Sequence, residues 1–197
     1  DKTSHNNPNV NLVNNTSHSF SLDWTNSDDL SGIDYIELYA KNNDGTVIDI
    51  DGDSSTEDYI TLTASDEDYT VDGLSEYDDY DYKVVTYDKA GNSTVDGFYT
   101  MTTDDITEPV VGFNTNSRDW LNTDVDETIN IDDTGGSGVA QAWYKWTTSP
   151  EQPTSGWVEM GTTTNFARTQ SQEGEWYLHI KATDNYDNTA YDYSGAY

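Results

Sequence analysis

Two similar stretches of sequence decide the fold: residues 80–92, which read YDYKVVTYDKAGN, and residues 176–188, which read WYLHIKATDNYDN. In each stretch, apolar or aromatic residues occupy every second position, and the run ends at an aspartate, Asp88 in the first and Asp184 in the second. Alternation with a period of two is typical of a β-strand that buries one face. We therefore predict two equivalent strands, each of which delivers a carboxylate to a tight loop.

Short strands separated by turns are predicted on both sides of these two stretches. The dipeptide Asp44-Gly45 is the strongest turn signal, and it predicts a hairpin that returns as a strand over residues 46–50. No stretch has the period of a helix. The pattern therefore predicts an all-β chain made of two tandem antiparallel β-sandwiches, with about seven strands each. The other expected strands span residues 10–13, 20–24, 33–40, 59–62, 69–74, 95–101, 110–113, 127–131, 139–146, 157–160, 166–168 and 189–193.

The repeat also places the domain boundary. Ser31-Gly32-Ile33 is repeated as Ser137-Gly138-Val139, in the same order relative to the two long stretches. A chain of 197 residues is long enough for two domains of ordinary size, so we expect domains at residues 1–103 and 104–197. The connecting segment, residues 103–109, reads TDDITEP, and Pro109 should make it stiff.

The composition limits the partners of the protein. The chain has 38 acidic and 8 basic residues and a net charge of -30, which would repel nucleic acids and anionic membranes and attract cations. It has no cysteine and no apolar run long enough to cross a membrane, so we expect no membrane insertion by this segment. Because residue 1 is Asp, we expect a processed chain or an excised segment of a longer protein.

Several residues carry a family resemblance. The first half, with Trp24, Leu74, Tyr80, Tyr82 and Val84 in core positions, resembles a bacterial fibronectin type III domain. The second half, with DDTGGSG at residues 132–138 and EGEWYLHIKATDN at residues 173–185, is similar to the immunoglobulin-like repeats of large bacterial surface proteins and adhesins. The resemblance implies an extracellular, cell-surface protein of the adhesin or S-layer type. In such a protein this segment would be a spacer or stalk, with neighbouring domains of the same protein as its partners.

Acidic residues are concentrated at one predicted end of the second sandwich. The lead-in segment, the loop between the second and third strands and the loop between the sixth and seventh strands should meet there. Carboxylate, amide and carbonyl oxygens are the ligands that calcium prefers, so we predict Ca²⁺ as the bound ion, whereas the three histidines are too scattered for a zinc site. The residues gathered at this end are Asp104, Asp105, Glu108, Asp132, Asp133, Asp184, Asn185, Asp187 and Asn188.

The resemblance assigns a role to some of these positions. In similar bacterial repeats, calcium at such a junction stiffens the linker between domains. The matching positions in the second half are Asp105, Asp133, Asp184 and Asn188, with Asp104, Glu108, Asp132 and Asp187 as further candidate ligands, and those in the first half are Asp29, Asp88 and Asn92. Two alternatives are that these are solvated turn residues, or that the acidity reflects adaptation to high salt.

A second candidate function is a carbohydrate-binding accessory module of a secreted polysaccharide-active enzyme. Aromatic rings can stack on sugars, and Trp143 and Trp157 are the tryptophans of the second half that we expect to be exposed. A glycan or another surface protein would then be the partner. We expect no catalytic activity, because the paired acids lie on predicted strands and turns that face solvent and no nucleophile motif is present.

Overall fold

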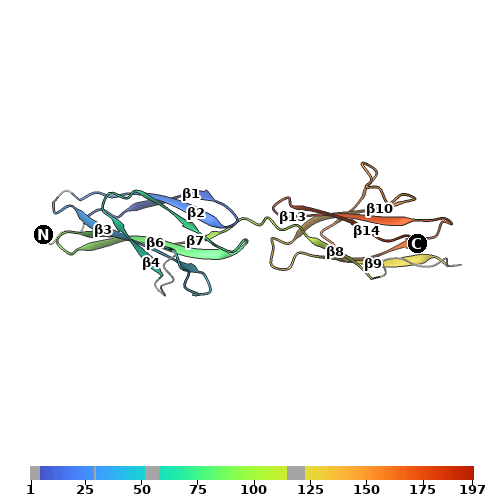
Figure 1. The fold of residues 1–197 in the computed structure, drawn as a ribbon, viewed down its shortest axis with the longest axis horizontal. Coiled ribbons are helices and arrows are strands. Elements are labelled where there is room, and N and C mark those ends of the chain that lie inside the picture. The colour runs from blue at the N-terminus through green and yellow to red at the C-terminus, as the bar shows by residue number, and fades with distance from the viewer. Residues whose placement is uncertain (1–4, 29, 52–57, 115–122) are drawn as a thin grey trace. The chain divides into compact units, whose positions relative to one another are not determined.

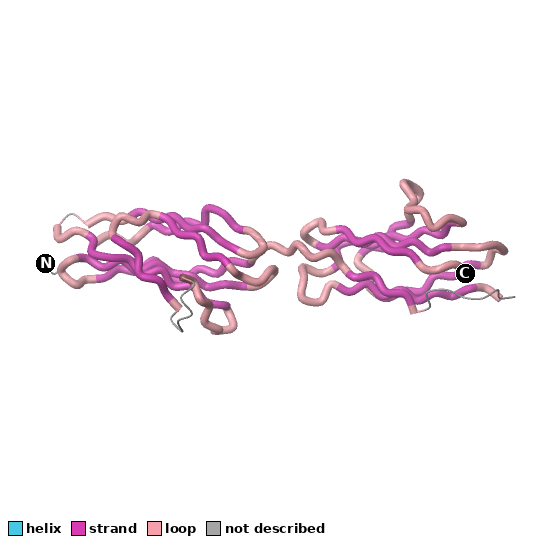
Figure 2. Tube along the Cα trace, in the orientation of Figure 1, coloured by secondary structure: helices cyan, strands magenta, loops and turns pink. Residues whose placement is uncertain are grey.

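The computed structural model describes residues 5–28, 30–51, 58–114 and 123–197. The chain divides into two compact units, Asp1–Asp104 and Asp105–Tyr197, which we call unit 1 and unit 2. All regular elements of the described residues are β-strands (Figure 2). Accordingly, this part of the chain contains no helix that could span a membrane.

Unit 1 is an antiparallel β-sandwich of seven strands (Figure 1). A three-stranded sheet in the order β1-β2-β5 packs on a four-stranded sheet in the order β4-β3-β6-β7. The strands are β1 (Asn9–Asn15), β2 (Ser19–Thr25), β3 (Ile33–Asn42), β4 (Tyr59–Thr63), β5 (Asp68–Asp72), β6 (Asp79–Asp88) and β7 (Ser93–Thr102).

Unit 2 repeats this plan strand for strand. Its three-stranded sheet has the order β12-β9-β8 and its four-stranded sheet the order β11-β10-β13-β14, so β13 takes the place that β6 has in unit 1. The predicted fold class, two tandem antiparallel sandwiches, is confirmed. The strands are β8 (Val110–Phe113), β9 (Val125–Asp132), β10 (Val139–Thr147), β11 (Val158–Gly161), β12 (Asn165–Gln170), β13 (Tyr177–Asp184) and β14 (Thr189–Tyr193).

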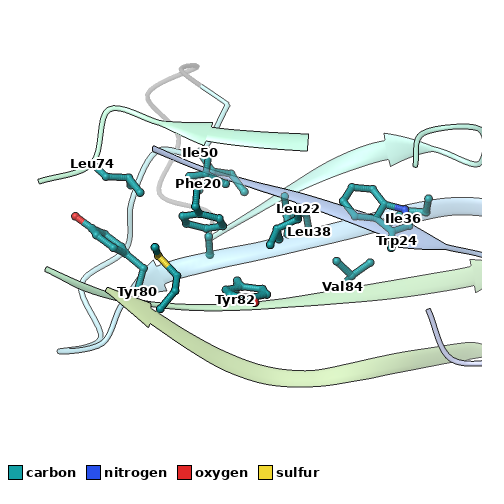
Figure 3. Packing of buried hydrophobic residues seen from close by; sticks show 13 residues of the cluster. Phe20, Leu22, Trp24, Ile36, Leu38, Ile50, Leu74, Tyr80, Tyr82 and Val84 are labelled. Carbon is teal, nitrogen blue, oxygen red and sulfur yellow. The ribbon is translucent and has the colours of Figure 1, made fainter. Parts of the chain in front are cut away.

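The core of unit 1 is organised around β6. Tyr80, Tyr82 and Val84 point inward from this strand and meet Phe20 and Trp24 from the opposite sheet (Figure 3). The alternation that predicted the strand is therefore the alternation that fills the core. The Tyr80 hydroxyl also accepts a hydrogen bond from the backbone N–H of Ser75, at 2.9 Å, which fixes the turn that leads into β6.

The core of unit 2 is built in the same way around β13. Leu178, Ile180 and Ala182 are fully buried, as their phase predicts, and Ile129 and Ile131 face them from β9. Trp176 lies just before the strand and is half-buried. Its backbone N–H donates a hydrogen bond to the carbonyl of Tyr197, and its carbonyl accepts one from the N–H of Tyr197.

The predicted strand over residues 46–50 is wrong. The turn at Asp44-Gly45 does form: Gly45 has a φ of 91°, and Asn42 N–H donates to the carbonyl of Thr46. Only one bridge, Lys41 to Val47, follows it. The chain then leaves β3, because Ile50 is drawn into the core and its carbonyl accepts a hydrogen bond from Tyr69 of the other sheet.

Candidate metal centre

Three carboxylates of unit 2 converge at one end of its sandwich. Asp105 is the first residue of the unit, Asp133 follows β9, and Asp184 ends β13. One oxygen of each carboxylate lies within 4.8 Å of the others, and we call this group the acidic triad. Asp105 and Asp184 are buried and Asp133 is half-buried, so these carboxylates are not fully solvated surface acids.

Asp184 is held by the loop that follows it. Its Oδ1 accepts hydrogen bonds from the backbone N–H groups of Tyr186 (2.8 Å) and Asn188 (2.9 Å), and its Oδ2 accepts one from Asn188 Nδ2 (2.7 Å). Asp187 is in the left-handed region, with a φ of 68°, which lets the loop close over four residues. Asn188 Nδ2 also donates to the carbonyl of Asp105, so Asn188 ties two members of the triad together.

Backbone N–H groups orient the other two members. Asp105 Oδ2 accepts from Ser137 N–H and Asp133 Oδ2 accepts from Gly138 N–H, each at 2.6 Å. Gly136 passes so close that a Cβ on it would lie 2.7 Å from Asp133 Oδ1 and 2.9 Å from Asp105 Oδ2. The glycine-rich loop therefore does two things: it donates hydrogen bonds to the carboxylates and it leaves the space between them open.

The carboxylates of the triad carry uncompensated charge. Burial raises the pKa of Asp133 against the lowering effect of the hydrogen bond from Gly138, and repulsion from Asp105 and Asp184 adds to the rise. Burial also acts to raise the pKa of Asp105, but hydrogen bonds from Ser137 and Thr107 hold that pKa below its ordinary value. The loop thus favours the charged form of Asp105, next to a carboxyl group whose charged form is disfavoured by burial and by like charges, and a bound cation would relieve this situation.

The geometry of the triad fits a calcium ion. Ca²⁺ binds oxygen at about 2.3–2.6 Å, so oxygens on opposite sides of its shell lie roughly 5 Å apart. The separation of up to 4.8 Å within the triad falls inside this limit. All three candidate ligands are carboxylates, which favour hard cations over zinc or copper. Backbone carbonyls and water would complete the shell.

The structure places the other predicted ligands outside the triad. Asp132 Oδ1 accepts hydrogen bonds from the N–H and hydroxyl of Thr134 in a local turn. Asp104 belongs to unit 1, where its carboxylate faces Asn15 Nδ2 at 3.4 Å. Glu108 and Asp187 are exposed. The side-chain amide of Asn188 donates hydrogen bonds to the carbonyl of Asp105 and to Asp184 Oδ2.

Unit 1 has the same late loop but not the same group of acids. Asp88 accepts hydrogen bonds from Ala90 N–H, Asn92 N–H and Asn92 Nδ2, as Asp184 does from its own loop. Asp29 lies outside the described residues. Within the part of unit 1 that the structure describes, Asp88 does not belong to a group of three carboxylates like the acidic triad. Asp88 instead lies next to His5, whose Nδ1 is 4.0 Å from Asp88 Oδ2.

The outer face of the four-stranded sheet in unit 2 is aromatic. Trp143, Lys181 and Tyr191 are adjacent in register on β10, β13 and β14, and Trp157 follows the loop before β11. Both tryptophans are half-buried. Lys181 Nζ lies 3.9 Å from the centre of the Trp143 ring, so it covers the face on which a sugar would stack, and the edge of Trp157 packs against Tyr191.

His179 is buried on this face, although its phase on β13 predicted an outward position. Its Nε2 is 2.8 Å from Thr147 Oγ1 and 3.0 Å from the carbonyl of Ser149, and its ring stacks on Tyr191 and Tyr193. Burial lowers the pKa of His179, and the charge of Lys145 lowers it further, against the opposing effect of the hydrogen bond to Ser149. A neutral His179 therefore fastens the loop after β10 to the sheet.

Unit 1 and unit 2 each have seven strands in two facing antiparallel sheets, and both are therefore β-sandwich modules. Residues 6–96, which lie in unit 1, match the family model of the fibronectin type III domain. No curated protein matches the chain significantly. A solved structure from the computer-based redesign of a β-sandwich protein is similar, with 20% identity, a TM-score of 0.39, and coverage of 50% of this chain and 90% of that one.

Proposed function

We propose that this chain is a non-catalytic spacer segment of an extracellular surface protein, and that Ca²⁺ bound by Asp105, Asp133 and Asp184 stiffens its linker. The observation that carries the proposal is the convergence of three carboxylates, two of them buried, around a glycine that leaves the space between them open. The match of residues 6–96 to the fibronectin type III model supports the spacer role, because such domains are commonly structural modules.

The connection between the units explains how an ion would act on the linker. Asp104 is hydrogen-bonded within unit 1: its N–H donates to the carbonyl of Thr16, and its carbonyl accepts from Tyr77 N–H. Asp105 is hydrogen-bonded within unit 2 through Ser137 and Asn188. The chain therefore passes from one unit to the other between two consecutive residues, and an ion on Asp105 would fix the second of them.

The expected strength suits an extracellular protein. Calcium sites of extracellular modules have dissociation constants on the order of 0.1 to 1 mM. At a few millimolar calcium, mass action then stabilises the folded unit by roughly 1 to 2 kcal/mol. That is a substantial fraction of the stability of a small domain.

The test is thermal unfolding of the full chain in millimolar CaCl₂ and in excess chelator, followed by tryptophan fluorescence. Trp24 is the only tryptophan before residue 105 among the six in the sequence, so the signal reports mainly on unit 2. We expect calcium to raise the melting temperature of unit 2 in the native chain and not in an Asp184→Asn variant. A melting temperature that ignores calcium but rises in molar NaCl would refute the site and favour adaptation to high salt.

A further inference from the structure

The loops that build the acidic triad have counterparts in unit 1 with the same hydrogen bonds. Asp28 Oδ2 accepts from Gly32 N–H at 2.6 Å, as Asp133 Oδ2 does from Gly138. Lys89 N–H donates to the carbonyl of Gly32 in unit 1, and Asn185 N–H donates to that of Gly138 in unit 2. Asp28 and Asp88 therefore correspond to Asp133 and Asp184, although the loop from Asp28 to Gly32 is one residue shorter than the loop from Asp133 to Gly138.

Among the described residues next to these carboxylates, two exchanges add a basic group to unit 1. Beside Asp88 lies the imidazole of His5, whereas beside Asp184 lies the carboxylate of Asp105. Lys89 replaces Asn185: Lys89 Nζ lies 3.6 Å from the point that a Cβ on Gly32 would occupy, and Asn185 Nδ2 lies 3.7 Å from the same point on Gly138.

His5 is built into its place. Only 7% of its surface is exposed, and its Nε2 is hydrogen-bonded to Thr86 Oγ1. Thr86 precedes Asp88 by two residues, and the residue at that position in unit 2 is Ala182, which could make no such bond. His5 Nδ1 has no hydrogen-bond partner among the described residues and faces Asp88 Oδ2 at 4.0 Å.

The charge at the two sites follows from these exchanges. The described groups of unit 1 are two carboxylates, one ammonium and one imidazole, whereas unit 2 has three carboxylates and an uncharged amide. Hydrogen bonds from Asn92 lower the pKa of Asp88, and hydrogen bonds from Leu30 and Ser31 lower that of Asp28, whereas the pKa of Asp133 is raised.

We propose that His5 and Lys89 close the unit 1 site against calcium, so that the chain binds one calcium ion, in unit 2, and these two positions decide which unit binds. The inference rests on the proposed function for the unit 2 site. In unit 1, a buried imidazole and a lysine take the place of the third carboxylate and of the ion.

Exchanging the two residues between the units tests this proposal. We expect His5→Asp with Lys89→Asn to raise the number of calcium ions per chain from one to two. The reciprocal exchange, Asp105→His with Asn185→Lys, should weaken binding in unit 2 at least tenfold, since loss of a ligand costs at least as much as loss of its support. Calorimetric titration with CaCl₂ and native mass spectrometry measure the stoichiometry, and circular dichroism checks that each variant is folded.

The single variant Lys89→Asn is the matched control. It leaves His5 in place, so it should still bind one ion. Two ions in the native chain, or only one in a folded His5→Asp, Lys89→Asn variant that keeps its unit 2 site, would overturn the proposal. If the native chain binds none and the double variant binds one, unit 1 is closed as inferred and the proposed function of unit 2 fails. No binding by either chain overturns both.

Discussion

Replacing Asp133 with asparagine should change the stability of unit 2 in opposite directions with and without calcium. Asparagine keeps an oxygen that can accept from Gly138 N–H but removes one of three like charges within 4.8 Å. At that distance two unit charges repel by about 1 kcal/mol in water and about 3 kcal/mol at an effective dielectric constant of 20. Because Asp133 is half-exposed, the lower figure applies to each of its two pairs.

Without calcium, the variant should therefore be the more stable protein. Relief of about 2 kcal/mol of repulsion, less roughly 1 kcal/mol for the loss of a charge-assisted hydrogen bond, leaves a net gain of about 1 kcal/mol. For a domain of this size that gain raises the melting temperature by roughly 4 to 8 °C. With a few millimolar calcium the native protein gains about 1 to 2 kcal/mol of stability, whereas the variant gains little. The difference in stability between the two proteins should then disappear or change sign.

The assay is fluorescence-detected unfolding in chelator and in calcium, with Asp124→Asn as the control. Asp124 is an exposed acid of the same unit, so its replacement changes the net charge equally but leaves the triad intact. The control should keep the full calcium effect. If Asp133→Asn lowers the melting temperature in chelator and responds to calcium like the native protein, the triad is neither repulsive nor a site, and our reasoning is wrong.

Three further predictions follow from the same structure. Gly136→Ala should weaken calcium binding at least tenfold in a calorimetric titration, because its Cβ would lie 2.7 Å from Asp133 Oδ1, whereas Gly97→Ala, with nothing within 4 Å, should not. The folded pKa of His179 is lowered from 6.5, so unit 2 should lose stability as pH falls below about 6.5, and urea titrations of a His179→Gln variant should not show this loss. Leu178→Ala in the core should cost about 2 to 5 kcal/mol in the free energy of unfolding, and Val158→Ala, at 48% exposure, less than about 0.5 kcal/mol.

The strands of this chain could be predicted because their alternation is local. Tyr80, Tyr82 and Val84 are in phase with the core, as are Leu178 and Ile180 in the second unit. The strand predicted at residues 46–50 failed because a turn signal fixes only the reversal of the chain. Whether a ladder follows depends on Ile50, which is pulled toward Tyr69 by a contact that no local pattern records.

The candidate site was predictable in part. Topology alone brings Asp105, Asp133 and Asp184 to one end of a sandwich, and the structure places them together. Topology could not decide whether Asp132 or Asp133 joins the site. Adjacent residues point in different directions, and only the backbone conformation decides which side chain turns inward. Nor could topology show that Gly136 leaves the opening between the carboxylates, although the paired glycines at residues 135 and 136 were a signal.

The histidines show where alternation along a strand fails to predict burial. His5 has no local pattern around it, and its contact with Asp88 spans most of unit 1. His179 has the phase of an exposed residue, but a loop and two tyrosines cover it, so burial on an outer sheet face depends on what lies above the sheet.

The loops Asp88–Asn92 and Asp184–Asn188 show how one backbone turn can present different side chains. In both, the first and last residues supply the side-chain hydrogen bonds that set the backbone. The three residues between them read KAG in one loop and NYD in the other. The fourth residue of each loop has a positive φ, 85° at Gly91 and 68° at Asp187, whereas the second and third residues differ in chemistry. The same backbone turn therefore carries a lysine in one unit and an asparagine in the other.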